Sequence, residues 1–275
     1  MNARKMFVSL FAIALLSACN GNISEIIQPA EPPEESATHT NQVHWSYEGE
    51  EGPEHWGGEC RAGESQSPID IANTNAEDLP NIVIHYEDSD LRIMNNGHTV
   101  QVDYNAPGEA PRSYIEVIDA NGQPQRYDLA QFHYHAPSEH TVGTKRFEAE
   151  LHIVHQNADK KPAVVIGILL EEGAENPAYQ PFLANLPNEI SEEATPISGV
   201  TVNATDLLPA TQTTFRYSGS LTTPPCTEGI SWIVMTTPVQ LSADQLERLE
   251  SVFEFRNNRP VQLLNERPLI EDTTP

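Results

Sequence analysis

The sequence has little positive charge and few cysteines, and it lacks an apolar run long enough to cross a membrane. Lys and Arg number 15 against 40 Asp and Glu in 275 residues. Residues 1–43 hold two of the basic and four of the acidic residues, so the rest of the chain holds 13 and 36, a formal net charge of −23. Such a surface repels nucleic acid and favours solubility. The charge therefore excludes a nucleic-acid partner but does not indicate a reaction.

The beginning of the chain has the pattern of an export signal. Arg4 and Lys5 precede the apolar run 6–16, which is shorter than the ~20 residues of a membrane-spanning helix. We therefore predict a signal peptide over residues 1–18. The stretch Leu16-Ser17-Ala18-Cys19 resembles a bacterial lipobox, which would imply cleavage before Cys19 and attachment of a lipid to its sulfur. The alternative is an ordinary signal peptide with a cysteine near its end.

Residues 19–43 are rich in Pro, Glu, Ser and Thr and contain no Phe, Trp, Tyr, Lys or Arg. Such a segment cannot bury enough apolar surface to fold, so we predict a disordered tether. Residues 44–271 have the composition of one globular domain. Two of the three cysteines, Cys60 and Cys226, lie in this domain. In an exported protein they either form a disulfide or remain buried free thiols.

The domain is predicted to be mainly β with minor α. One helix is expected from Ser242, whose capping-box partner would be Gln245. The expected fold is a single domain on a large, twisted, mostly antiparallel central sheet with a few short peripheral helices. Apolar alternation with Pro and Gly between the segments predicts strands at 82–85, 99–104, 112–118, 129–135, 148–155, 163–170, 213–218 and 230–236.

Three histidines on two of these strands are the most informative feature. Residues two apart on a strand share a face, so His133 and His135 project together with Gln131, and His152 projects with Glu150. If the strands are neighbours, three imidazoles converge, each beside a polar side chain that can hold it. Three protein ligands and an open position are typical of catalytic zinc.

The other histidines are given no metal role. His140 is expected to be a hydrogen-bonded residue of the core or next to the ligands. His155 is expected to face away from the ligand side, because it is an odd number of residues from His152. Four more occur in tether or turn contexts: His39, His44, His55 and His85. The tenth histidine, His98, follows Asn96-Gly97 and is also given no metal role.

Seven short motifs together resemble the α-class carbonic anhydrases over nearly the whole domain. They are Gln66–Asp70, Asn95–His98, Gln131–His135, Ser138–His140, Glu150–His155, Ser220–Pro225 and Asn258–Pro260. The resemblance implies a zinc enzyme that hydrates carbon dioxide reversibly to bicarbonate and a proton, by zinc-hydroxide attack with a histidine proton shuttle. In this family zinc lowers the pKa of its bound water to about 7.

The resemblance also implies roles for individual residues. The zinc ligands would be His133, His135 and His152. Gln131 and Glu150 would hold His133 and His152, and the backbone carbonyl of Asn258 would orient His135. Thr222 would orient the hydroxide against Glu139 and bind substrate oxygen, and Thr223 would line the bicarbonate position. The apolar wall for carbon dioxide would be Val154, Val165, Leu221 and Ile230.

The same resemblance makes His98 the proton shuttle, with Tyr47 and Asn96 as partners in the water chain. Cys60 and Cys226 match the cysteine pair of secreted members, which favours the disulfide. The chain departs from the family at Ala136-Pro137, where animal enzymes carry Trp-Gly, and at Ile230, which replaces the usual valine. Neither change touches the metal set.

Two other functions are open from the residues alone. His133, His135 and Glu139 also fit the first metal motif of cupins, which would bind iron or manganese, although the second cupin motif is absent. A non-catalytic surface adhesin is the other alternative, since family members that have lost ligands serve as binding domains. Against it, the histidines, Glu139 and Thr222 are all retained.

Overall fold

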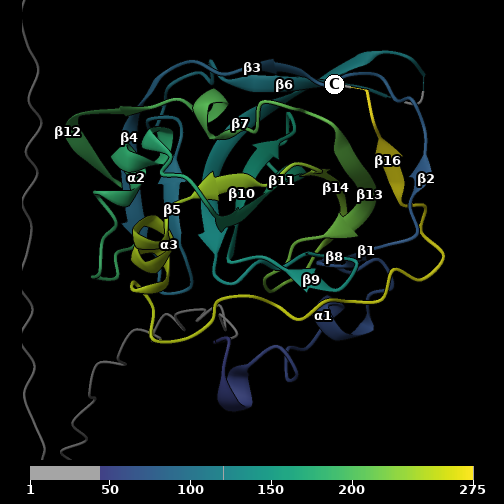
Figure 1. The fold of residues 1–275 in the computed structure, drawn as a ribbon, viewed down its shortest axis with the longest axis horizontal. Coiled ribbons are helices and arrows are strands. Elements are labelled where there is room, and N and C mark those ends of the chain that lie inside the picture. The colour runs from purple at the N-terminus through teal and green to yellow at the C-terminus, as the bar shows by residue number, and fades with distance from the viewer. Residues whose placement is uncertain (1–43, 120, 275) are drawn as a thin grey trace, which may run out of the picture. The chain divides into compact units, whose positions relative to one another are not determined.

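The computed structural model describes residues 44–119 and 121–274 (Figure 1). The expected signal peptide, the tether and Cys19 lie outside the described residues. Among the residues that are described, no helix has the length and apolar character needed to cross a membrane.

A sheet of 13 strands runs through the domain, and a second sheet of three strands lies beside it. The main path is β12-β4-β5-β7-β10-β11-β14-β13-β16-β2, and the small sheet is β1-β8-β9. Most neighbours are antiparallel, but β11 pairs in parallel with both β14 and β15, and β16 pairs in parallel with β2. The predicted fold class is confirmed.

The strands, in chain order, are β1 (Asp70–Ile71), β2 (Asn75–Ala76), β3 (Val83–His85), β4 (Ser89–Asn95), β5 (Val100–Asp103), β6 (Tyr114–Ile118), β7 (Pro124–His135), β8 (Thr141–Val142), β9 (Lys145–Arg146), β10 (Ala149–Gln156), β11 (Pro162–Glu172), β12 (Thr195–Val202), β13 (Thr214–Ser220), β14 (Glu228–Met235), β15 (Val239–Leu241) and β16 (Ile270–Asp272). The short helices are η1 (Gly49–Glu51), α1 (Glu59–Ala62), η2 (Pro177–Tyr179), α2 (Gln180–Leu183), η3 (Ala204–Leu207) and α3 (Ala243–Glu250).

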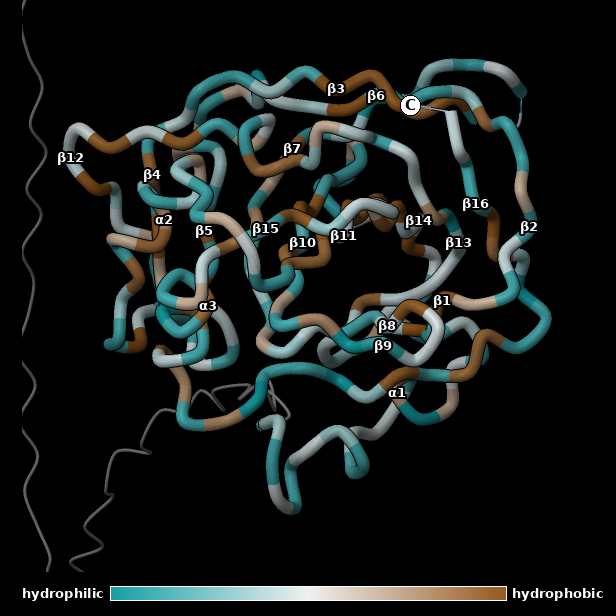
Figure 2. Tube along the Cα trace, in the orientation of Figure 1, coloured by the Kyte–Doolittle hydropathy of each residue, from teal (hydrophilic) through white to brown (hydrophobic). Residues whose placement is uncertain are grey.

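Alternation along the central strands divides the apolar residues between two cores, one on each face of the sheet. Leu151 and Ile153 of β10 pack into the larger core, whereas Val154 packs into a smaller one with Trp232. Figure 2 shows hydrophobic residues along β10, β11 and β14, whose middle residues are buried. His152 therefore lies on the face of the smaller core, next to Trp232, with little access to solvent.

The helix predicted from Ser242 is α3. The Ser242 hydroxyl accepts from the Gln245 backbone N–H, and the Gln245 side chain accepts from the Ser242 N–H, so the capping box is present. Both bonds satisfy donors that a helix start leaves unpaired. On the buried side, Leu246 and Leu249 pack into the larger core.

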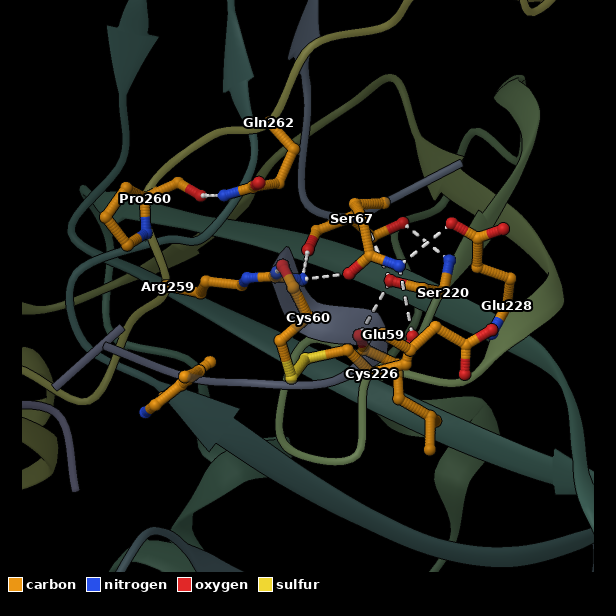
Figure 3. Close-up of a disulfide and its surroundings, with 12 residues drawn as sticks. Glu59, Cys60, Ser67, Ser220, Cys226, Glu228, Arg259, Pro260 and Gln262 are labelled. Carbon is orange, nitrogen blue, oxygen red and sulfur yellow. Dashed lines mark hydrogen bonds between the residues drawn. A yellow bond between two sulfur atoms is a disulfide. The ribbon is translucent and has the colours of Figure 1, made fainter. Parts of the chain in front are cut away.

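A disulfide joins Cys60 of α1 to Cys226 in the turn after β13, across a separation of 166 residues (Figure 3). Both sulfurs lie in a small core with Tyr47 and Trp56. The predicted cysteine pair is confirmed. A structural disulfide indicates an oxidising compartment, so the domain is an exported one.

Candidate metal centre

The three histidines come together on β7 and β10. These strands are antiparallel neighbours, with His152 opposite His133 and Glu150 opposite His135. Cross-strand partners share a face, so the rings converge, with centroids 4.7–5.2 Å apart. One ring nitrogen from each histidine lies within 4.8 Å of the others.

The second nitrogen of each ring is held by a fixed acceptor. His133 Nδ1 lies 2.8 Å from Gln131 Oε1, and His152 Nε2 lies 3.0 Å from Glu150 Oε1. His135 Nδ1 donates to a backbone carbonyl 2.6 Å away. Because an amide oxygen, a carboxylate and a carbonyl all accept, each ring keeps its lone pair on the other nitrogen. His135 Nε2 is buried and has no hydrogen-bond partner within residues 44–119 and 121–274, so the donor set fits a metal ion.

The carbonyl that holds His135 belongs to Asn257, so the assignment to Asn258 is wrong. Asn257 is almost completely buried, and its side chain accepts from Ala136 N–H and donates to the carbonyl of Tyr134. These bonds fix Asn257 against the end of β7 with its carbonyl toward the ring. Asn258 lines a surface cavity instead.

Burial keeps the three imidazoles neutral, as metal ligands must be. The pKa of His133 is well below its ordinary value, first through burial and then through repulsion from the other two rings. Burial lowers the pKa of His135 to about 4, although its bond to the Asn257 carbonyl opposes the change. Burial also lowers the pKa of His152, partly opposed by Glu150.

Glu139 is completely buried beside the ligands. Its Oε1 accepts from Arg259 N–H at 2.8 Å, and its Oε2 lies 3.5 Å from His135 Nε2. Burial raises the pKa of Glu139 to about 7, while the electrostatic influence of the His152 ring, the Arg259 N–H and the Thr222 hydroxyl act in the opposite direction. Thr222 is thus near enough to influence this carboxyl group, as the sequence suggested.

The turn that carries Thr222 is tightly held. Leu221 N–H donates to Thr227 at 3.0 Å, and Cys226 N–H donates to Thr223 at 2.8 Å. Leu221 packs against the smaller core, which also contains the other three residues of the expected apolar wall, Val154, Val165 and Ile230.

His98 lies at the margin of the site, half-buried and stacked on Trp45 with ring centroids 3.7 Å apart. Partial burial, and then repulsion from His44, lowers its pKa from the ordinary value. The Asn96 side-chain oxygen is committed to the backbone N–H groups of His98 and Thr99. Asn96 therefore shapes the turn beneath His98. The buried hydroxyl of Tyr47 has no hydrogen-bond partner among the described residues.

Two further residues on the ligand face, Gln101 and Asp103, were not predicted from the sequence. Gln101 of β5 lies opposite His133, and Asp103 lies opposite Gln131, so both share the ligand face. Gln101 Nε2 donates to Asp103 at 2.6 Å. Their alternation with buried Val100 and Val102 was a usable signal, but the register of β5 against β7 was not readable.

The comparisons with known proteins identify the family. The model of the eukaryotic-type carbonic anhydrase family matches residues 51–273. A carbonic anhydrase of Klebsiella pneumoniae is 42% identical over 83% of this chain and 91% of its own length. A solved α-carbonic anhydrase from Thermovibrio ammonificans, in complex with the inhibitor sulfanilamide, is 40% identical with a TM-score of 0.75, over 82% of this chain and 98% of that one. A hyperthermostable carbonic anhydrase from a hydrothermal vent chimney is 42% identical, with a TM-score of 0.74, over 83% of this chain and 100% of that one.

The chain therefore belongs to the α-carbonic anhydrase family. It is an enzyme of reversible carbon dioxide hydration, and its cofactor is zinc. This membership decides against the cupin interpretation. The retained set of three histidines, together with relatives that are carbonic anhydrases, decides against a purely adhesive role.

Proposed function

We propose that His133, His135 and His152 bind the catalytic zinc and that Glu139, Thr222 and His98 act with it in the hydration of carbon dioxide. The observation that supports this most strongly is the set of three converging imidazoles. Each is fixed through one nitrogen, and the other nitrogen of His135 is buried with no hydrogen-bond partner in the described part of the chain.

These three neutral imidazoles would hold zinc, which would lower the pKa of a bound water to about 7, a value that belongs to this enzyme family. Thr222 donates its hydroxyl proton to Glu139, which leaves the Thr222 oxygen to accept from the attacking water and to direct it. This requires an ionised Glu139. Burial raises the pKa of this carboxyl group to about 7, and a cation bound beside it would favour the ionised form.

The substrate is placed by the turn and the wall. Val154, Val165 and Ile230 are almost completely buried, and Leu221 packs against them. Such a surface suits an apolar gas and disfavours the charged product. The Thr222 backbone N–H donates to a substrate oxygen, and Thr223 lines the position where bicarbonate forms.

His98 carries away the proton that each turnover releases. With a donor pKa near 7 and reprotonation near the diffusion limit, direct loss to solvent runs at only about 10³ s⁻¹. A histidine titrates near ambient pH and removes this limit. Tyr47 and Asn96 would lie along the intervening water chain.

Metal analysis and stopped-flow hydration of carbon dioxide test the assignment. Purified wild-type protein is expected to hold one zinc and to be inhibited by a sulfonamide. His152→Ala is expected to lose both zinc and activity, because one of three ligands is gone. His155→Gln is the matched control, since His155 is on the same strand and equally buried but bonds Tyr86 on the other side of the sheet. Full activity in zinc-free His152→Ala would refute the site.

We further propose that the mature protein is a periplasmic or cell-envelope lipoprotein anchored through Cys19. The lipobox-like sequence 16–19 and the tether composition of 19–43 support this, as does the disulfide of the domain. Labelling with a radioactive fatty acid tests it. Wild-type protein is expected to take up label and fractionate with membranes, and Cys19→Ser to do neither. Unlabelled wild-type protein would indicate an ordinary signal peptide.

A further inference from the structure

A chain of buried hydrogen bonds runs from Glu150 away from the metal ligands. His140 Nδ1 lies 2.7 Å from Glu150 Oε1, and His140 Nε2 lies 2.7 Å from the Tyr217 hydroxyl. That hydroxyl lies 2.8 Å from Ser67 Oγ, which accepts from Ser220 N–H at 3.1 Å. Tyr217 is 5% exposed and the other four residues are completely buried. The chain ends two residues before Thr222.

The protons of this chain can be assigned from donor and acceptor rules. The Glu150 carboxylate accepts, so His140 Nδ1 carries a proton and its Nε2 accepts from Tyr217. The Tyr217 oxygen then accepts from the Ser67 hydroxyl. A doubly protonated His140 would reverse the tyrosine and leave the Ser67 proton without an acceptor among the described residues. Every donor therefore points toward Glu150, an arrangement in which successive bonds strengthen one another.

Contacts of the backbone around Ser67 hold this series of hydrogen bonds in place. Ser67 N–H donates back to Ser220 Oγ at 3.0 Å, so two bonds join these residues. The Ser67 carbonyl accepts from the Arg259 guanidinium at 2.7 Å, part of the cluster in Figure 3. Gly219 packs against the same point, where a Cβ atom would lie 2.1 Å from Ser67 Oγ. Only glycine therefore leaves room for the two hydrogen bonds between Ser67 and Ser220.

Glu150 also bonds the backbone of the segment that contains Glu139. Its Oε2 accepts from the backbone N–H groups of Glu139 and His140 at 2.9 and 2.8 Å. The acceptor of His152 is thus bonded directly to the segment of Glu139 and, through His140, Tyr217 and Ser67, to the strand end that leads into Thr222.

We propose that His140, Tyr217 and Ser67 are positioning residues that couple retention of the metal by His152 to the placement of the Thr222 turn. This inference rests on the proposed zinc site and deepens it. Partners of metal ligands typically contribute 10- to 100-fold to metal affinity or activity. Tyr217 is two hydrogen bonds further away than such a partner, because His140 lies between it and Glu150, so a smaller effect is expected.

Tyr217→Phe tests the coupling, with Tyr86→Phe as its control. Both variants delete one hydroxyl that is bonded to the Nε2 of a fully buried histidine, at 2.7 Å for His140 and 2.8 Å for His155. Only the Tyr217 hydroxyl belongs to the series of hydrogen bonds that leads to Glu150. Zinc dissociation into excess chelator, the visible spectrum of the cobalt-substituted protein, kcat/KM and the unfolding midpoint are measured for each.

Tyr217→Phe is expected to release zinc about 3- to 10-fold faster than wild type, to alter the cobalt spectrum and to lower kcat/KM by a similar factor. Tyr86→Phe is expected to stay within about twofold of wild type in all three, whatever its unfolding midpoint. Ser67→Ala independently removes the hydroxyl that bonds both Tyr217 and the Ser220 N–H. It replaces Tyr217→Phe if that variant does not fold. Combining the two changes is expected to add little to the larger single effect, because both interrupt one chain.

Equal zinc dissociation from Tyr217→Phe and Tyr86→Phe would overturn the coupling and leave the network a purely structural one. Wild-type protein without zinc would instead refute the metal site itself, and this inference with it. The two failures are therefore distinguishable.

Discussion

Glu150 links the metal ligand His152 to the segment that contains Glu139 and His140. Its two carboxylate oxygens receive four hydrogen bonds, from the backbone of Glu139 and His140 and from the rings of His140 and His152. Burial alone would raise its pKa, but the electrostatic influence and the hydrogen bonds of the His140 and His152 rings hold the pKa well below its ordinary value. The carboxylate therefore remains an acceptor, and His152 keeps its proton on Nε2.

Glu150→Gln is expected to lower the free energy of unfolding by about 2–3 kcal/mol and the affinity for zinc by about 10- to 100-fold. The amide nitrogen would meet N–H donors and leave at least one of them unpaired. Urea unfolding and competition with a chelator measure the two effects. Glu148→Gln is the control, since this residue is exposed two positions earlier. Equal zinc affinity in the two variants would contradict the assigned role of Glu150.

His98→Ala is expected to slow turnover several-fold at low buffer concentration, and added imidazole is expected to restore it, because a diffusing base replaces the missing one. His85→Ala is a fair comparison, since His85 also stacks on an aromatic ring, Tyr114, at 4.6 Å but is not part of the site. Unchanged turnover in His98→Ala would remove its shuttle role.

The pH dependence of His98 provides a separate measurement. Its burial against Trp45 lowers its pKa, so at a given pH below neutrality less of it is protonated than of a free histidine. Trp45→Ala is expected to raise the pKa toward the ordinary value, which NMR titration of the ring protons follows. A titration midpoint that does not rise would show that Trp45 is not the source of the burial.

The ligands could be predicted from the sequence because two-residue spacing on a strand fixes the face of a side chain. Asn257 could not, because the bond from His135 reaches 122 residues along the chain to a segment outside regular strands. A one-residue error there exchanges a buried asparagine for one that lines a surface cavity. The His140–Tyr217 bond spans 77 residues and depends on strand order, which periodicity does not contain.

At the scale of elements, all eight predicted strands occur, with ends displaced by up to five residues. β4 was missed although Leu91 and Ile93 alternate with polar residues. β12 was missed because it contains Pro196 and Gly199, which are unfavourable inside a strand. Both are tolerated here because β12 is an edge strand, which among the described residues pairs only with β4. Edge strands therefore carry less sequence signal than central ones.

The disulfide joins two elements that frame the site, α1 and the turn of Thr222 and Thr223. Replacing both cysteines with alanine is expected to lower the free energy of unfolding by about 3–5 kcal/mol, because the unfolded chain loses a long closed loop. Urea unfolding with and without reductant measures this. Reductant is expected to destabilise the wild type and leave the double variant unchanged. A wild type that is insensitive to complete reduction would contradict the stabilising role.

The charge of the whole molecule acts against its compact state. With 36 acidic and 13 basic residues in 44–275, most exposed charges are of one sign, and a net charge this far from zero repels itself. Exposed ion pairs such as Arg112–Glu87 and Lys145–Glu171 contribute only about 0–1 kcal/mol each. Salt weakens both the attraction within these ion pairs and the repulsion between the excess acidic groups. We expect the repulsion to be the larger of the two free energies.

Raising NaCl from about 0.01 to 1 M shortens the screening length from about 30 to 3 Å, so the midpoint of urea unfolding is expected to increase. A variant with Glu148→Gln, Glu250→Gln and Glu254→Gln, all at exposed positions, is expected to start from a higher midpoint at low salt and to respond less. Wild type and variant should therefore converge as salt rises, because screening makes the removed charges irrelevant. A wild-type midpoint that falls with NaCl would mean that the ion pairs outweigh the repulsion, and that the acidic surface does not destabilise the fold.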